Sequence, residues 1–227
     1  MATYDLEEQE QLAEMKAWWK MYGSLVTGII TAASIGVIAW QGWNWYQRNQ
    51  AAQASMVYGV LQKSALEKDS QRIKAASGEL LEKFGGTTYA SLGALIAAKA
   101  TFDAGDLKTA KAQLAWVAEH GKDELRDLAR LRLAAVLLDE KAYDEALKQL
   151  DGNPAAGFIV RFAETRGDIL SAQGKKAEAH SAWQAALTKL DEADKSGKGK
   201  NSLQDRQANA PYREMLQQKL DALGESK

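Results

Sequence analysis

The chain has 227 residues, which is long enough for one domain with a substantial hydrophobic core. Its 29 basic and 30 acidic residues give a net charge of −1, which excludes the strongly basic, clustered surface typical of nucleic-acid-binding proteins. With two prolines and abundant Ala, Leu, Lys, Glu and Gln, the sequence predicts an almost entirely α-helical protein.

Residues 1–20 precede the most apolar part of the chain. They carry apolar residues at Leu6, Ala13 and Met15, followed by a pair of tryptophans. This pattern fits either a short amphipathic helix at the cytoplasmic surface or a frayed terminus, and both interpretations stay open.

Residues 21–47 form the longest apolar segment, with no charged residue between Lys20 and Arg48. A helix needs about 20 mainly apolar residues to cross a hydrocarbon core of roughly 30 Å. Aromatic side chains that favour the membrane–water boundary gather at both ends of the segment. They are Trp18, Trp19 and Tyr22 around its start, and Trp40, Trp43, Trp45 and Tyr46 near its end. We therefore predict a single transmembrane helix at residues 21–47, surrounded by membrane lipid.

A cleaved signal peptide is the alternative interpretation of this segment. Signal peptides open with a short basic region and have an apolar run of about 7–15 residues. Here the apolar run follows a long N-terminal segment in which acidic residues outnumber Lys16 and Lys20. A retained anchor fits this arrangement better.

The orientation of the anchor follows from the basic residues close to the membrane. Lys16 and Lys20 lie before the helix and Arg48 lies after it, which favours a cytoplasmic N-terminus. The large C-terminal part would then be exported, to the periplasm in a Gram-negative bacterium. The absence of cysteine is consistent with an oxidising compartment.

Small residues recur every four positions along one side of the predicted anchor, at Ser24, Gly28, Ala32 and Gly36. Such a ridge lets two membrane helices approach closely, so we expect it to be a helix-packing surface. The alternative is that Gly and Ala are simply common in membrane helices.

The exported part, residues 48–227, is predicted to be one domain. Residues 50–69 and 70–84 favour two helices, and Gly85 and Gly86 end the second one. We expect these two helices to form an irregular pair ahead of a more regular repeat.

Three later segments, residues 97–117, 133–150 and 166–187, align on their turns. Each has a turn residue five positions before an Ala, a larger apolar residue four positions after that Ala, and a small residue seven positions before the turn. The turn residues are Gly105, Lys141 and Gly174; the Ala residues are Ala110, Ala146 and Ala179; the larger residues are Leu114, Leu150 and Trp183; the small residues are Ala98, Ala134 and Gly167.

This spacing resembles the tetratricopeptide repeat, in which paired antiparallel helices cross closely at small residues. The match departs from the pattern at Lys141, which replaces the turn glycine, and in lacking the early aromatic and the closing proline. The predicted fold is therefore all-α, a single N-terminal transmembrane helix followed by a tetratricopeptide-like helical solenoid. An irregular helical bundle is the alternative.

The last part of the chain changes in character. Residues 191–208 are charged and polar, which predicts a mobile loop. Residues 210–223 begin near Pro211 and carry apolar residues on one face, which predicts a helix that caps the end of the solenoid.

The sequence contains no pattern that predicts catalysis. His120 and His180 are the only histidines, and neither lies at metal-ligand spacing from another ligand. There is no cysteine nucleophile, phosphate-binding loop or hydrolase serine motif. We expect no enzymatic activity, no cofactor, no metal and no small-molecule substrate.

What remains is a surface for a protein partner. The first helix of each pair should line the concave face, where the first two units place apolar residues and the third unit places Glu164, Asp168 and Ser171. An apolar groove of this kind would suit an extended peptide or a partner helix, unless residues 50–84 or the terminal helix already fill it. The candidate partner-binding residues are Leu95, Lys99, Phe102, Leu131, Ala135 and Leu138.

Several features together resemble one family. They are the acidic, Trp-containing N-terminus, the single anchor, the stretch YASLGALIAAK, the turn and helix GDLKTAKAQLAWV, and a final helix near Pro211. Over its whole length the chain resembles the ancillary SecYEG translocon subunit family. The resemblance implies a bacterial inner-membrane protein with an exported tetratricopeptide-like domain. It also implies association with the SecYEG translocon and with a periplasmic, membrane-anchored chaperone of the prolyl-isomerase type.

The expected function is that of a non-catalytic scaffold, which holds a chaperone near newly translocated proteins. Two alternatives stay open. The groove itself could bind unfolded segments as a direct periplasmic chaperone, or the protein could be an assembly factor for another envelope complex.

Overall fold

The computed structural model describes residues 3–196 and 202–224, and all of its regular secondary structure in these ranges is helical. The chain divides into two compact units, residues 1–52 and residues 53–227. The first helix, α1 (Thr3–Leu66), contributes to both of them. The fold class is the one that the sequence predicts.

The first unit consists of the part of α1 before residue 53. Of the two interpretations of residues 1–20, the structure shows a helix, which begins at Thr3. Among the described residues, one helix is long and apolar enough to cross a membrane, and the candidate span lies within Glu10–Leu66. This helix continues beyond both ends of the predicted segment 21–47. The backbone is thus helical without a break on both sides of the predicted segment.

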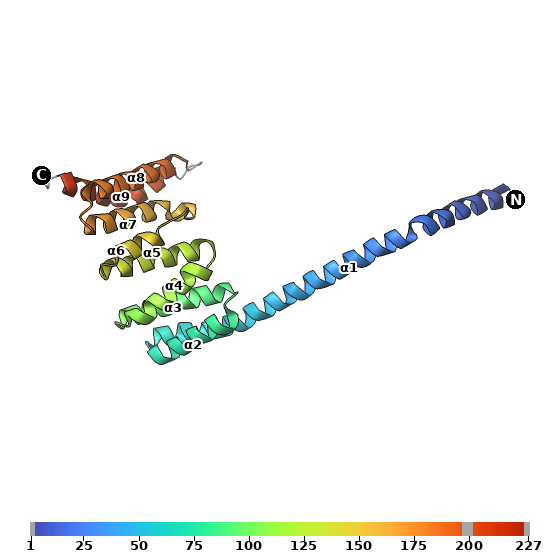
Figure 1. The fold of residues 1–227 in the computed structure, drawn as a ribbon, viewed down its shortest axis with the longest axis horizontal. Helices are drawn as coiled ribbons and strands as arrows, with labels where there is room; N and C mark the ends of the chain where they lie inside the picture. Colours follow the sequence, from blue (N-terminus) through green and yellow to red (C-terminus); the bar gives the residue numbers. More distant parts are fainter. Residues whose placement is uncertain (1–2, 197–201, 225–227) are drawn as a thin grey trace. The chain divides into compact units, whose positions relative to one another are not determined.

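The second unit is a stack of helices in chain order (Figure 1), in which the end of α1 shares a buried cluster with α2 and each later helix packs against the next. The final residues of α1, from position 53 onward, supply its first helix. The others are α2 (Ser70–Phe84), α3 (Thr88–Asp103), α4 (Leu107–His120), α5 (Asp123–Asp139), α6 (Tyr143–Gln149), the 3₁₀ turn η1 (Ala156–Phe158), α7 (Ile159–Ala172), α8 (Lys176–Ser196) and α9 (Ser202–Gly224).

The three predicted turns have the same backbone conformation. Gly105, Lys141 and Gly174 have φ angles of 80°, 61° and 79°. In each turn the next residue donates its N–H to the carbonyl five positions earlier, at 2.8–2.9 Å, which closes the preceding helix. Lys141 thus takes the left-handed conformation that glycine adopts more easily, and the predicted repeat alignment is confirmed.

A fourth turn of this kind lies between α1 and α2. Lys68 has a φ of 57°, and the N–H of Asp69 donates to the carbonyl of Ser64 at 3.0 Å. Leu61, seven positions before this turn, and Ile73, five positions after it, are both buried. The first helix pair therefore has the same geometry as the other three, but large residues occupy positions that hold Ala or Gly elsewhere.

The small residues of the repeat lie where paired helices cross. All three aligned Ala residues, Ala110, Ala146 and Ala179, are completely buried. Gly167 faces Trp183, and a Cβ atom added at Gly167 would overlap the indole ring. Close crossings of this kind let the larger side chains bury against the next pair.

The structure corrects the prediction of a loop at residues 191–208. Helix α8 continues to Ser196 and α9 already begins at Ser202, so Pro211 lies inside α9 and not at its start. Two residues of the predicted loop, Asp191 and Asp194, lie on α8 and pair with Arg213 of α9 at 2.8 Å and 2.7 Å. A helix held by charged contacts needs no apolar stripe of its own there. Residues 197–201 of the predicted loop lie outside the described residues.

Candidate functional site

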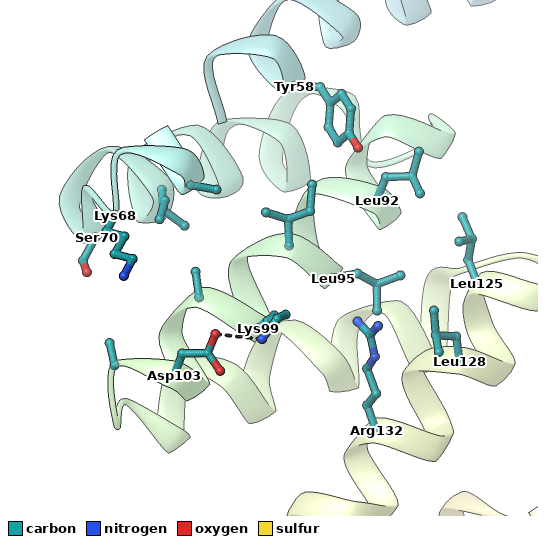
Figure 2. Close-up of a pocket in the computed structure, with 15 residues that line it drawn as sticks. Tyr58, Lys68, Ser70, Leu92, Leu95, Lys99, Asp103, Leu125, Leu128 and Arg132 are labelled. Atoms are coloured by element: carbon teal, nitrogen blue, oxygen red, sulfur yellow. Dashed lines mark hydrogen bonds and ion pairs between the residues drawn. The ribbon is translucent and has the colours of Figure 1, made fainter. Parts of the chain in front are cut away.

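An apolar depression of the second unit lies over the first helices of successive pairs. It is a hollow of about 650 Å³, which we call the N-terminal hollow, and the end of α1, together with α2, α3 and α5, forms its walls. Figure 2 shows Leu92 and Leu95 reaching it from α3, and Leu125 and Leu128 from α5. Tyr58 closes one side from α1.

A second depression of about 300 Å³, the central hollow, lies between α3, α4 and α5. Its apolar residues include Phe102, Leu114 and Ala135. Three polar residues, Lys99, Asp103 and Arg132, line both hollows and so form the wall that the two share. We call the two hollows and this wall the groove.

The shared wall carries a positive charge that the groove does not neutralise. Lys99 pairs with Asp103 at 2.8 Å, and both side chains are exposed. Arg132 is exposed as well, and its side chain makes no ion pair or hydrogen bond with any described residue. Figure 2 shows Arg132 extending from α5 toward Leu95, with Leu128 beside it. A guanidinium therefore stands unpaired among apolar side chains.

The structure distributes the six predicted concave residues between the groove and the core. Leu95 and Lys99 line the N-terminal hollow, and Lys99 also lines the central hollow with Phe102 and Ala135. Leu131 is buried in the central core, and Leu138 packs against that core. Which of the six contacts a partner stays a prediction.

Some groove residues were not singled out from the sequence. Leu125, Leu128 and Arg132 follow one another at helical spacing along α5, and Tyr58 and Leu92 complete the N-terminal hollow. The spacing on α5 was the available signal. It could not show that this face lies open, because openness depends on the neighbouring helices.

At the predicted concave positions of the third repeat, helix α9 lies against the polar residues of α7. Tyr212 of α9 donates a hydrogen bond to Glu164 at 2.6 Å, and Lys219 contacts Glu164 and Asp168 at 2.7 Å each. The sequence suggested two segments that could fill the concave face, residues 50–84 and the terminal helix. The terminal helix covers the polar end of that face. Residues 53–84 instead form one side of the N-terminal hollow.

Electrostatics favour this contact between α7 and α9. Burial alone would lower the pKa of Lys219, but its hydrogen bonds to Asp168 and Glu164 raise the pKa above its ordinary value. Burial and the hydrogen bond to Glu164 likewise raise the pKa of Tyr212. Lys219 therefore stays protonated and Tyr212 stays neutral through the physiological pH range.

In the first unit, the small-residue ridge lies open on the helix surface. Ser24, Gly28, Ala32 and Gly36 are all exposed. A Cβ atom at Gly28 or Gly36 would meet no described side chain within 4 Å. The ridge is therefore accessible to another membrane helix.

In the described part of the chain, no group of three His, Cys, Asp or Glu side chains is arranged to hold a metal ion. The described groove has apolar walls, an exposed ion pair between Lys99 and Asp103, and the guanidinium of Arg132.

Comparison with known proteins agrees with this architecture. Residues 16–225 match the family described as a tetratricopeptide repeat-like domain. The chain is 33% identical over 223 residues to the ancillary SecYEG translocon subunit of Neisseria gonorrhoeae, covering 96% of this chain and 98% of that protein. The protein of the same name from Escherichia coli is 32% identical over 192 residues, covering 82% of this chain and 90% of its own length.

The Haemophilus influenzae protein of that name is 31% identical over 185 residues, covering 81% of this chain and 90% of that protein. The family match over residues 16–225 includes both the apolar N-terminal segment, which fits a single-pass inner-membrane protein, and the stacked helix pairs. The chain belongs to the tetratricopeptide repeat-like family of ancillary SecYEG translocon subunits.

Proposed function

We propose that this protein is a membrane-anchored, non-catalytic scaffold that associates with the Sec translocon and holds a periplasmic chaperone near newly translocated proteins. Its N-terminus would lie in the cytoplasm and its second unit in the periplasm. The chaperone would be a membrane-anchored protein of the prolyl-isomerase type. The observation that carries the proposal is the open apolar groove over α3 and α5, in a chain with one apolar anchor helix.

The names of the relatives support the association with the translocon, since three of them are ancillary SecYEG translocon subunits. The groove supports the recruitment of a protein, because an apolar depression with a few polar groups suits a peptide or a helix. Anchoring both proteins in one membrane raises their effective concentration, so even weak groove contacts would keep them together.

The proposal assigns the two partnerships to different parts of the chain. The groove would hold the chaperone. The ridge of Ser24, Gly28, Ala32 and Gly36 would pack against a membrane helix of the translocon.

A pull-down from detergent-solubilised membranes tests this assignment with two sets of variants. The pair Phe102→Asp and Ala135→Asp puts carboxylates into the central hollow, and we expect recovery of the chaperone to fall about tenfold or more while the translocon is retained. The pair Gly28→Leu and Gly36→Leu should do the reverse, because bulky residues would keep the membrane helices apart.

Leu107→Asp is the matched control for the groove variants. Leu107 is 38% exposed and Phe102 is 41% exposed, but Leu107 lies on α4 outside both hollows. The control should retain both partners. Unchanged recovery of the chaperone with the groove variants would rule out the groove as its docking site.

Direct chaperoning is the second candidate, because the same apolar groove could take an extended unfolded segment. The discriminating measurement is suppression of the aggregation of a denatured client by the purified protein. Binding of a chaperone without any suppression would rule the second candidate out.

The third candidate, an assembly factor for another envelope complex, predicts a different set of proteins in the same pull-down. Recovery of the subunits of that complex in place of the translocon and chaperone would favour it.

A further inference from the structure

The apolar groove contains three charged residues in the wall between its hollows, and their arrangement bears on which partner segments can bind. Its two hollows share one polar wall, made of Lys99, Asp103 and Arg132. Apolar side chains can therefore enter on either side of this wall, and whatever connects them must cross it. The chemistry of the crossing point depends on which of the three polar groups is free to bind.

Of the three charged residues, Arg132 is the one whose side-chain N–H donors have no partner among the described residues. The Lys99–Asp103 pair is internally neutral, and both of its members are well exposed, so the pair is weak and can rearrange. Arg132 makes no side-chain ion pair or hydrogen bond within the ranges that the structure describes, and Leu95 and Leu128 flank it. A guanidinium presents a fixed fork of N–H donors that matches a carboxylate.

The remaining charges near the wall favour the same sign of ligand. The N-terminal hollow is lined by three basic residues, Lys68, Lys99 and Arg132, and by one acidic residue, Asp103. A carboxylate that arrives at Arg132 therefore meets a net positive surrounding. A basic or neutral group at that point would leave the guanidinium partly desolvated and unpaired, which is unfavourable.

Resting on the proposed function, we propose that the groove recognises a partner segment with an acidic side chain between two apolar ones, and that Arg132 binds this acidic side chain. The carboxylate belongs to a side chain and not to a chain terminus, because hollows lie on both sides of Arg132. A terminal carboxylate at Arg132 would leave one hollow empty. The segment is thus an internal stretch of the partner.

Synthetic peptides test this proposal on the full-length protein in detergent. The probe is a fluorescein-labelled, amidated peptide with the core LLAELLA between Gly-Ser ends, compared with a twin in which Gln replaces the Glu. Fluorescence anisotropy should show the Glu peptide binding about tenfold more tightly than its twin, since hydrogen bonds between charged groups are the stronger ones.

Variants at Arg132 then locate the preference. Arg132→Gln should abolish the preference for Glu, and Arg132→Glu should reverse it through like-charge repulsion. Lys108→Glu is the control, because Lys108 is exposed on α4 and lines neither hollow. It should leave the preference unchanged.

Three outcomes would overturn the proposal: equal binding of the two peptides, binding of neither, or a preference that survives Arg132→Gln. The pull-down separates this failure from failure of the proposed function. If the Phe102→Asp and Ala135→Asp pair loses the chaperone and Arg132→Gln does not, the groove docks the chaperone without reading an acidic residue. If all these variants retain the chaperone, the groove is not its docking site, and that part of the proposed function fails as well.

Discussion

At the scale of single residues, this fold depends on turn conformation and on close helix crossings. Lys68 and Lys141 adopt the left-handed conformation at a cost that Gly105 and Gly174 avoid. One close crossing is at Gly167, against Trp183. The indole N–H of Trp183 donates to Asp168 at 2.9 Å, which holds the ring in that place.

Gly167→Ala tests the crossing with a single added methyl group. Because the new Cβ would overlap the indole, we expect the free energy of unfolding to fall by about 1–3 kcal/mol. Thermal unfolding of the full-length protein, followed by circular dichroism, measures the change.

Gly78→Ala is the matched control for this substitution. Gly78 lies within α2, and a Cβ there meets no described side chain within 4 Å. Alanine should stabilise the helix at that position by about 0.5–1 kcal/mol, since it restricts the unfolded chain. Equal effects of the two substitutions would contradict the close crossing at Gly167.

At the scale of elements, α9 covers the end of the helix stack and also the polar part of the concave face on α7. Its apolar residues Leu216 and Leu220 are buried in a core with Trp183. Its polar residues Tyr212 and Lys219 reach across to α7. The groove is consequently confined to the first helix pairs.

Lys219→Met tests the contact between α9 and α7. The substitution would leave Glu164 and Asp168 without their cationic partner. We therefore expect the free energy of local opening of α9 to fall by about 1–3 kcal/mol. Hydrogen exchange of the α9 amides measures this opening. Lys189→Met is the control, because Lys189 makes an exposed pair with Glu192 within α8 alone.

The pH dependence of the same contact has a defined sign. The pKa of Lys219 is raised above its ordinary value of 10.5, so its contribution to stability is complete below that value and is lost as the pH rises through the folded pKa. The difference between wild type and Lys219→Met should therefore persist at pH 8 and shrink above about pH 10.5. A difference that grows with pH would contradict the assigned contact.

At the scale of the whole molecule, the described chain combines a long apolar N-terminal helix with a tetratricopeptide-like domain of stacked helices. Each unit has an exposed surface that its own packing does not use. The first unit exposes the small-residue ridge, and the second exposes the groove. The first surface is formed by small side chains, and the second by apolar side chains around three polar ones.

The orientation of the anchor gives the prediction at this scale. We expect the protein to remain in the membrane fraction after an alkaline carbonate wash. A C-terminal tag should resist protease in intact cells and be digested once the outer membrane is opened, because Lys16 and Lys20 favour a cytoplasmic N-terminus. Protection of the tag in spheroplasts would reverse the orientation and place the groove in the cytoplasm.

The sequence by itself determined the features that depend on local patterns. The apolar anchor helix follows from one uninterrupted stretch of residues, and three turns follow from residues at fixed spacings around Gly105, Lys141 and Gly174. These signals depend on residues close together in the sequence, so they can be recognised without knowledge of tertiary contacts.

Only the tertiary structure decided the features that depend on contacts between distant residues. The first helix pair has Leu61 and Ile73 at positions where the pattern expects small residues. In the last pair, Asp191 and Asp194 at the end of α8 pair with Arg213 of α9, a contact between residues distant in the sequence. The groove likewise depends on where neighbouring helices leave Arg132 uncovered. The position of a residue in the periodic pattern assigns its side chain to a helix face. Packing against other helices decides whether that face is buried, paired or open.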